Sequence, residues 1–569
     1  MLNMTKFVVL PPPPNEIATK LVEYDSKLIT LLHNRGITTV IEAKTYLNPE
    51  YDTGLHDPFL LHDMDKAMAR ILTAIGKNER VIIYSDYDCD GIPGAVVLHD
   101  FFTAVGFTNF YNYIPHRHFD GFGLSESAVL KLKTEQNPTL LITIDCGTSD
   151  LTAVALAQAN GIDVIVTDHH EPKEKLPEAV AVVNPKVGDT YPFPGLCGAA
   201  VIFKLVQALI ARGNFSILPG QEKWWLDMVG IATIADMVPL TGENRVLSHY
   251  GLAVLRKSRR PGLQQLLRQQ KTSQQYLTED DIGFTIGPRI NAASRMDTPE
   301  DAFQLLATKD EGEAGMHLKH LEKLNQERKT AVALMTREVH TRLKALSELP
   351  SVIVLGNPDW RPSLVGLAAS KLAEENNRPA FLWGRDGNGV LKGSCRSGGG
   401  VSVVTLMEAV PEIFHEFGGH HMSGGFSVRD ERIHDLAASL GQAYESLGAK
   451  AKINQPIQVD LELTLDEITR DLLKIQKQCA PFGADNPKPV YLIRNVTPKE
   501  VVVFGKAKEH LKLTFATAGL AKEAIAFFKS IDQFSKIPST ETPVSLLVQL
   551  EESFFMNRLQ TRLRIIDII

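Results

Sequence analysis

Cysteine is scarce in this chain, with five among 569 residues. An odd and scattered set does not build a disulfide framework, so we expect a reducing, cytoplasmic setting. No uninterrupted apolar segment is long enough to span a bilayer. The apolar stretch before the four prolines at 11–14 is also too short for a signal peptide. We therefore expect no membrane partner.

The chain also lacks a strong positive charge, since its formal net charge is −7 and its pI is near 6.2. This balance argues against a protein that coats duplex DNA, but it leaves room for a local basic path. Clusters of cysteine and histidine at the short spacing of a structural zinc site are absent. The length is too great for one core and predicts about three to five domains.

Carboxylates follow four short apolar runs in the first 240 residues. Runs rich in β-branched residues, with helical patterns between them, are typical of buried parallel strands. In such sheets ligands collect beyond the carboxyl ends of the strands, so acidic residues there can converge from distant segments. The runs are 81–85, 140–144, 164–167 and 229–235, and they lead to Asp86, Asp88 and Asp90, to Asp145, to Asp168-His169-His170, and to Asp236.

Carboxylate and imidazole ligands in this number suit Mg²⁺ or Mn²⁺. Two such ions can activate a water and stabilise both oxygens of an in-line displacement at phosphorus. The alternative is that each Asp caps the helix after its strand. For a single Asp that alternative is preferred, but it does not explain the whole set well.

These motifs resemble those of the DHH phosphoesterases: Asp86-Tyr-Asp-Cys-Asp-Gly91, Asp145-Cys-Gly147, Asp168-His-His170 and Asp236. Within that superfamily the chain resembles the RecJ family of single-strand-specific 5′ to 3′ exonucleases. The further matching segments are 55–59, 287–295, 393–397, 418–425 and 481–487. The ordered set is far more specific than any one motif.

The resemblance implies a set of functional residues. Two divalent cations, Mn²⁺ or Mg²⁺, would be held by Asp86, Asp88, Asp145, His169 and Asp236, with Asp145 as the bridge. His170 would contact the scissile phosphate or the departing oxygen, and Asp90 and Asp168 would be ligands or would orient them. The nucleic-acid contacts would be Arg289, Asn291, Arg295, Ser394, Arg396 and His420.

We expect a multidomain α/β protein. Apolar residues at helical spacing from Leu318 to Leu346 predict a long connecting helix, and alternating runs after residue 500 predict a small β-barrel, which the resemblance implies is OB-like. Phe504 and Phe515 could stack on bases there, although core positions are the preferred interpretation. The expected parts are a segment at 1–77 packed on the catalytic domain, a DHH-type doubly wound parallel sheet at 78–310, the helix at 311–347, a second α/β (DHHA1) domain at 348–450 and the barrel at 451–569.

The function implied is hydrolysis of phosphodiester bonds from the 5′ end of single-stranded DNA, in DNA repair and recombination. A helicase and a single-strand-binding protein are candidate partners, and we expect a monomer. One alternative is another DHH phosphodiesterase, acting on short RNA, a cyclic dinucleotide or pyrophosphate. A second is a catalytically silent replication scaffold.

Overall fold

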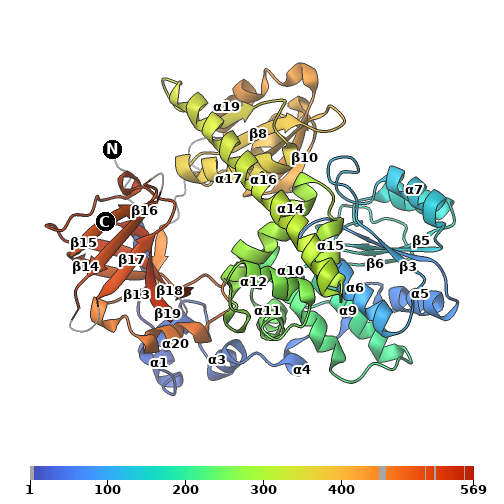
Figure 1. Cartoon of the computed structure of the whole chain (residues 1–569), viewed down its shortest axis with the longest axis horizontal. Coiled ribbons are helices and arrows are strands. Elements are labelled where there is room, and N and C mark those ends of the chain that lie inside the picture. The colour runs from blue at the N-terminus through green and yellow to red at the C-terminus, as the bar shows by residue number, and fades with distance from the viewer. Residues whose placement is uncertain (1–5, 448–455, 506–507, 518–520, 556–557) are drawn as a thin grey trace.

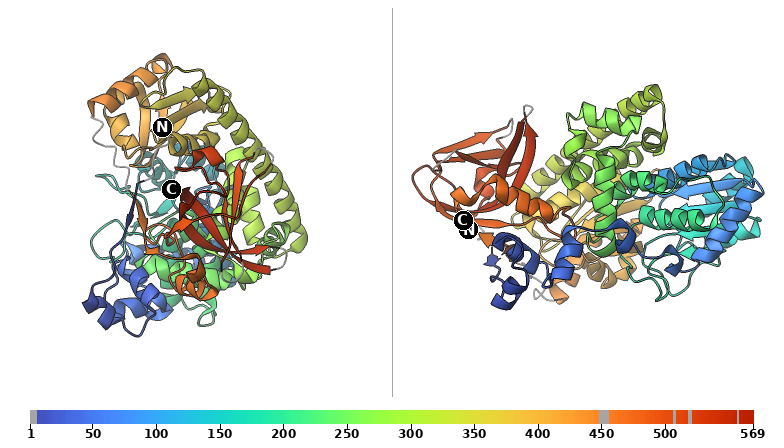
Figure 2. Two further views of the ribbon diagram at one scale, coloured as in Figure 1. Left: turned by 90° about the vertical axis from the view of Figure 1, so that its left-hand side faces the viewer. Right: turned by 90° about the horizontal axis from the view of Figure 1, so that it is seen from below.

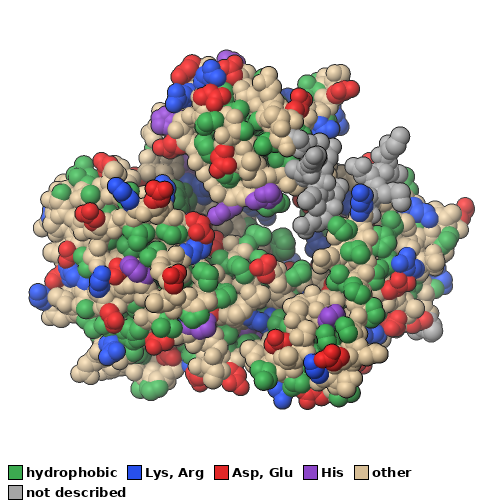
Figure 3. Space-filling model, turned by 180° about the vertical axis from the view of Figure 1, so that it is seen from behind, with side chains coloured by type: hydrophobic (Ala, Val, Ile, Leu, Met, Phe, Trp, Pro, Cys, Tyr) green, Lys and Arg blue, Asp and Glu red, His purple; other side chains and the backbone are tan. Residues whose placement is uncertain are grey.

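The structure is a computed structural model that describes residues 6–447, 456–505, 508–517, 521–555 and 558–569. Two α/β domains and a C-terminal β domain surround a central opening, and one long helix joins the α/β domains (Figures 1 and 3). The expected boundary at residue 450 lies outside the described residues. No helix in the described ranges combines the length and apolar character needed to cross a bilayer.

The first α/β domain holds an all-parallel sheet whose strands follow the order β3-β2-β4-β5-β6. Successive residues of each strand point to opposite faces, and helices bury both faces in two apolar cores. Its strands are β2 (Val81–Ser85), β3 (Phe110–Tyr113), β4 (Leu140–Ile144), β5 (Asp163–Thr167) and β6 (Ala181–Val183). Its helices are α6 (Gly91–Ala104), α7 (Glu126–Gln136), α8 (Leu151–Ala159), α9 (Gly198–Arg212), α10 (Leu226–Ala235), α11 (Gly242–Leu255), α12 (Pro261–Gln269), α13 (Glu279–Asp281), α14 (Gly287–Met296) and α15 (Glu300–Ala307).

One predicted strand is wrong, because the run at 229–235 lies in helix α10. A short, continuously apolar run does not distinguish a buried helix from a buried strand. Gly230 lets this helix pack closely on α11: a Cβ built on Gly230 would lie 2.6 Å from the Gly251 Cα. Asp236 therefore follows a helix end rather than a strand end.

Helix α16 (Glu311–Lys344) confirms the predicted connecting helix and, at 1.5 Å per residue, is about 51 Å long. Its first half packs on α12, α14 and α15, and its second half packs on α17 of the second domain. That domain has a mixed sheet in the order β10-β11-β9-β8-β7. Its elements are β7 (Ile353–Gly356), α17 (Pro362–Asn376), β8 (Ala380–Arg385), β9 (Leu391–Arg396), α18 (Val403–Glu408), β10 (Phe414–His420), β11 (Ser423–Val428) and α19 (Leu436–Ser446).

The C-terminal domain is a seven-stranded sheet with its own apolar core, which contains Phe515. Phe515 is thus a core residue, as preferred from the sequence. The elements of this region are β12 (Ile457–Val459), β13 (Leu461–Glu462), α20 (Arg470–Gln478), β14 (Tyr491–Val496), β15 (Glu500–Phe504), β16 (His510–Phe515), β17 (Lys522–Ala526), β18 (Val544–Phe555) and β19 (Arg558–Ile568).

The N-terminal segment divides between two domains. Tyr51 and Met64, from α4 (Tyr51–Gly54) and α5 (Met64–Gly76), join the core of the first domain. In contrast, β1 (Phe7–Val9) pairs with β12, and the helices α1 (Asn15–Lys20), α2 (Ser26–His33) and α3 (Val40–Leu47) cover Cys479 and Phe482 (Figure 2). Residues 7–47 therefore pack against the C-terminal region as well, because their apolar faces find partners there.

Candidate active site

The site lies at the carboxyl edge of the first sheet, between β2 and β4. The chain leaves β2 toward β3 on one side and returns to β4 on the other, so this is the switch point at which ligands bind in open parallel sheets. Asp145 adopts a left-handed backbone, with φ of 62°. A Cβ built on Gly198 would lie 2.6 Å from the Asp145 Cβ, so glycine at the start of α9 allows that helix to close on the site.

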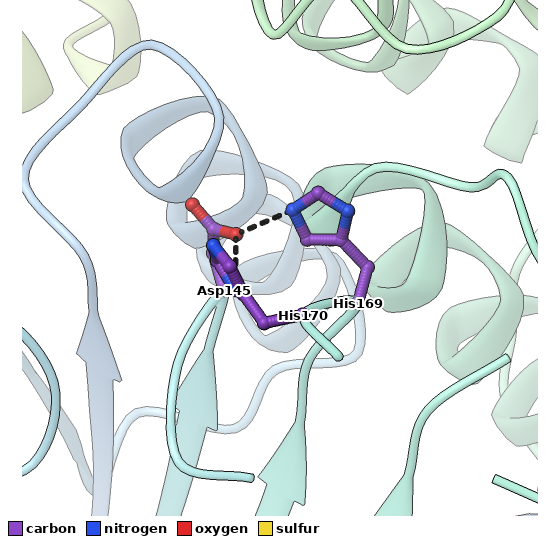
Figure 4. A group of neighbouring side chains, drawn as sticks. All are labelled: Asp145, His169 and His170. Carbon is purple, nitrogen blue, oxygen red and sulfur yellow. Dashed lines mark ion pairs between the residues drawn. The ribbon is translucent and has the colours of Figure 1, made fainter. Parts of the chain in front are cut away.

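His169 lies at the centre of the carboxylates. Its Nε2 is 3.1 Å from Asp145 Oδ1, and it is 3.6 Å from both Asp90 Oδ2 and Asp236 Oδ2. Figure 4 shows the rings of His169 and His170 turned toward Asp145. Two groups of possible ligand atoms, each lying within 4.8 Å of one another, are Asp86 with Asp88 and Asp145, and Asp90 with His169 and Asp236.

The electrostatics of this cluster fit cations. Burial, and then the charges of neighbouring carboxylates, raise the pKa values of Asp145 and Asp236. The Oδ1 atoms of Asp86 and Asp145 are buried without a hydrogen-bond donor. Burial and the charge of His170 lower the pKa of His169 to about 3, which keeps this imidazole neutral and able to ligate. An oxygen-rich, negatively charged set with one neutral histidine matches the ligand preferences of Mn²⁺ and Mg²⁺.

Asp168 orients His170. Its Oδ2 accepts a hydrogen bond from the Thr148 amide at 2.9 Å, and its Oδ1 accepts one from His170 Nδ1 at 2.7 Å. Burial on its own lowers the pKa of His170, but the hydrogen bond and charge of Asp168 outweigh it and raise that pKa to about 9. The His170 side chain is 41% exposed.

Asp90 joins two segments of backbone and also lies among the possible ligands. Its two oxygens accept hydrogen bonds of 2.6 and 2.7 Å from the amides of Gly198 and Ala199, which fixes the N-terminus of α9 on residues 86–90, here called the metal loop. Asp88 Oδ1 accepts from the amides of Asp90 and Gly91, which shapes the turn.

Four arginines gather beside the carboxylates. Burial, followed by the charges of Arg117 and Arg328, lowers the pKa of Arg295 to about 9, and Arg396 from the second domain adds to this effect. None of the four forms a salt bridge with a carboxylate in the described part of the chain. These guanidinium groups are half-buried. The hydrogen bonds that three of them donate go to neutral oxygens, of Ser363, Asn325 and Cys395. A cluster of guanidinium groups without carboxylate partners is a site for an anion such as phosphate.

The other predicted nucleic-acid contacts divide in the structure. Arg289 is buried, and its guanidinium donates to Glu322, Gln270 and the Thr285 carbonyl, so the prediction that it holds phosphate is not supported. Asn291 Oδ1 accepts from the Cys89 amide at 2.9 Å and holds the metal loop. Ser394 lies beside Arg396 near Gly366, whereas His420 is exposed at the end of β10.

Sequence reasoning missed Arg117 and Arg328. A signal existed for each: Arg117 lies among histidines just after the strand next to β2, and Arg328 interrupts the apolar stripe of α16.

Comparisons with known proteins match all three domains. Residues 80–233 match the DHH family, N-terminal domain, residues 349–446 match the DHHA1 domain, and residues 459–567 match the RecJ OB domain. The chain is 34% identical over 541 residues to the single-stranded-DNA-specific exonuclease RecJ of Bacillus subtilis, covering 95% of this chain and 67% of the relative. It is 30% identical to the protein of that name from Dickeya dadantii, covering 94% of each.

This chain belongs to the RecJ family. Its structure resembles RecJ from Thermus thermophilus in complex with Mn²⁺, with a TM-score of 0.82, 26% identity and coverage of 100% of this chain and 80% of that one. A Mg²⁺ complex of the same RecJ gives a TM-score of 0.75 at 25% identity, with 99% and 78% covered. This one relative is therefore known in complex with each of the two cations that the ligand chemistry favours here.

Proposed function

We propose that this chain is a metal-dependent exonuclease that hydrolyses phosphodiester bonds from the 5′ end of single-stranded DNA, in DNA repair and recombination. The observation that carries the proposal is the cluster of carboxylates around His169, which lies beside four arginines that form no ion pair with a carboxylate in the described residues. A centre for cations and a centre for phosphate lie side by side, as phosphodiester hydrolysis requires. A helicase and a single-strand-binding protein would supply the strand to a cytoplasmic monomer.

The metal ligands divide into two groups that share one cleft. Asp86, Asp88 and Asp145 would hold one cation, and Asp90, His169 and Asp236 the other. When bound, the two cations supply an activated water and neutralise charge on the phosphate. Asp145 belongs to one group of possible ligand atoms with Asp86 and Asp88 and to another with His169, so it is the residue that would serve both cations in this proposal.

The remaining residues act on the substrate. His170, oriented by Asp168 through its Nδ1, would donate a hydrogen bond from its other ring nitrogen to a phosphate oxygen or to the departing oxygen. Arg295, with Arg117 and Arg396, orients the backbone phosphates by charge-assisted hydrogen bonds. Because these groups contact phosphate rather than base edges, cleavage does not depend on sequence.

A basic groove offers a route away from the site. It includes Arg328, whose charge acts on Arg295, and follows one face of α16 to Lys371 of α17, with a volume of about 640 Å³. Two of its basic side chains, His340 and Lys371, pair with Glu375, and the others form no ion pair with a carboxylate in the described residues. Such a lining attracts a single-stranded backbone. The basic side chains of the groove are Arg328, Lys329, Arg337, His340, Lys344 and Lys371.

An assay with end-labelled oligonucleotides and Mn²⁺ tests the proposal. A duplex with a 5′ single-stranded tail should be shortened from that tail, and a blunt duplex should resist. Efficient digestion of blunt duplex, or attack from 3′ tails alone, would contradict it. Preferential cleavage of very short RNA or of a cyclic dinucleotide would favour another DHH activity, and no hydrolysis at all would favour the scaffold.

A further inference from the structure

The segment 115–123, here called the site loop, follows β3 and emerges at the same sheet edge as Asp86. The guanidinium of Arg117 lies 4.9 Å from the ring centre of Tyr87, which is the residue between the ligands Asp86 and Asp88. The ring of Phe122 meets His170 edge-on, at 5.5 Å between ring centres. One end of the loop is therefore attached to the metal centre.

The same loop reaches the second α/β domain. A Cβ built on Gly387, in the turn between β8 and β9, would lie 3.0 Å from the ring of Phe119. His118 Nε2 lies 3.1 Å from the carbonyl oxygen of Arg295. The site loop thus spans the cleft from the metal loop to the second domain and passes the arginine cluster.

Hydrogen bonds between its own residues hold the site loop in this conformation. Asp120 Oδ2 accepts from the His116 amide at 2.7 Å, and the Phe119 and Asp120 amides donate to the His116 carbonyl at 3.0 and 2.8 Å. Beyond it, the Asp150 carboxylate accepts from the Leu124 amide at 2.6 Å. A loop held by this many internal hydrogen bonds keeps its shape when a strand presses on it.

Two aromatic rings on this loop stay largely exposed, although Phe119 packs on His116 and Phe122 packs on His170. Phe119 is 63% exposed and Phe122 is 59% exposed, although both belong to the loop that contacts the candidate metal centre. Exposed rings at this place suit a surface on which a terminal base stacks.

We propose that the site loop, together with the turn at 386–389, forms an end wall of the active-site cleft. A strand then reaches the metal centre only by its terminus, and the wall fixes how many nucleotides lie beyond the scissile phosphate. This inference rests on the proposed nuclease function and gives it an additional property: the restriction to strand ends is steric, and Phe119 and Phe122 set the product length.

The test compares the full-length protein with the double variant Phe119→Ala/Phe122→Ala on two substrates. On 5′-labelled linear strands, we expect the share of products longer than one nucleotide to rise about tenfold, the effect of losing roughly one base–aromatic contact. On closed circular single strands, which have no terminus, we expect the parent protein to be inactive and the double variant to cut. Single-turnover conditions with enzyme in excess give the product length even where cleavage is slow.

The matched control is Trp224→Ala. Trp224 is also an exposed aromatic, at 50%, but it lies before α10, at the end opposite Asp236. Its product lengths should equal those of the parent. If the double variant cuts linear strands with unchanged product lengths and leaves circles intact, the end wall is wrong while the nuclease stands. If the parent protein cuts no linear strand, the proposed function fails instead.

Discussion

The metal centre and the C-terminal domain use opposite kinds of surface. At the metal centre the side chains are buried and charged: Asp86 and Asp145 are each 3% exposed. On the C-terminal domain Phe528 is 82% exposed and Phe527 is 39% exposed, and both rings pack edgewise on His510. Phe504 joins this group through its own contacts with His510 and Phe527.

The contrast follows from what each surface does. Hydrolysis needs ligands held in one geometry, so the first domain buries its carboxylates and braces them with backbone amides. Holding a strand of any sequence needs rings that accept every base, and exposed aromatics provide that. The carboxylates of the metal centre therefore repel one another in the folded protein, whereas the aromatic group of the C-terminal domain has almost no such repulsion.

The largest expected effect is on chemistry at the metal centre. Asp145→Asn should lower the cleavage rate by about three orders of magnitude or more, because several kcal/mol of charge stabilisation are lost and each 1.4 kcal/mol is tenfold. Single-strand affinity should stay within about twofold, since the arginines are untouched. Asp52→Asn, at a side chain that is 87% exposed, is the control. A residual rate near the parent value in excess Mn²⁺ would refute the bridging role.

The next effect separates two arginines. Arg295 is half-buried, donates to the Ser363 carbonyl at 2.7 Å and has no carboxylate partner in the described residues, whereas the buried Arg260 donates to Asp227 and Asp100 at 2.8 and 2.7 Å. Arg295→Gln should lower kcat/KM by about 10–100-fold, because a charge-assisted hydrogen bond to substrate contributes about 1.5–3 kcal/mol, and should destabilise the fold by only about 1 kcal/mol, since one hydrogen bond to a neutral oxygen is lost. Arg260→Gln should instead destabilise the fold by about 3–5 kcal/mol, since it leaves buried carboxylates unpaired. Equal effects of the two substitutions on stability would remove the distinction.

Some parts of this structure are predictable from sequence because local pattern and tertiary role agree. The runs ending at Asp86, Asp145 and Asp168 form parallel strands, since a strand buried on both faces is a continuous apolar run. The apolar residues of α16 recur at helical spacing, so they predict a helix. The carboxylates at the ends of these strands consequently lie together.

Other parts depend on contacts that the sequence does not reveal. The run before Asp236 is a helix that packs through Gly230 on Gly251 of α11, a contact that the apolar run alone does not reveal. Arg289 and Arg295 lie six residues apart on one motif, yet the first is paired with Glu322 and the second faces other arginines. Which arginine stays unpaired is decided by α16 and by the second domain, not by spacing within the motif.

A smaller effect is expected on the C-terminal surface. Phe528→Ala should weaken the binding of long single strands by about 1–3 kcal/mol, the value of one stacked base, and leave cleavage of short oligonucleotides unchanged. A point substitution is the suitable probe, because removing the whole domain would expose the N-terminal helices that pack on Cys479 and Phe482. Ile537→Ala, at an exposed apolar residue of the same domain, is the control. Unchanged affinity for long strands would assign this aromatic group to another role.

The smallest effect is on the melting temperature, which the repulsion between carboxylates at the metal centre should lower. In EDTA, Asp145→Asn should raise the melting temperature by a few degrees, because it removes one of several buried like charges. Burial and the neighbouring carboxylates raise the pKa of Asp145 in the folded protein. A carboxyl with a raised folded pKa favours the fold while it is protonated, and that contribution is lost as the pH rises above the ordinary carboxyl range.

The advantage of the amide variant should therefore grow between pH 5 and pH 8, a window that lies above the ordinary aspartate pKa of about 3.9. Saturating Mn²⁺ should reverse the order, since a cation at 100 times its dissociation constant stabilises the parent by about 2.7 kcal/mol and the variant has lost a ligand. Melting curves of both proteins, with EDTA or Mn²⁺ at each pH, measure this directly. If the variant melted below the parent in EDTA at every pH, Asp145 would be a structural carboxylate whose charge the fold already compensates, and the contrast with the C-terminal surface would not hold.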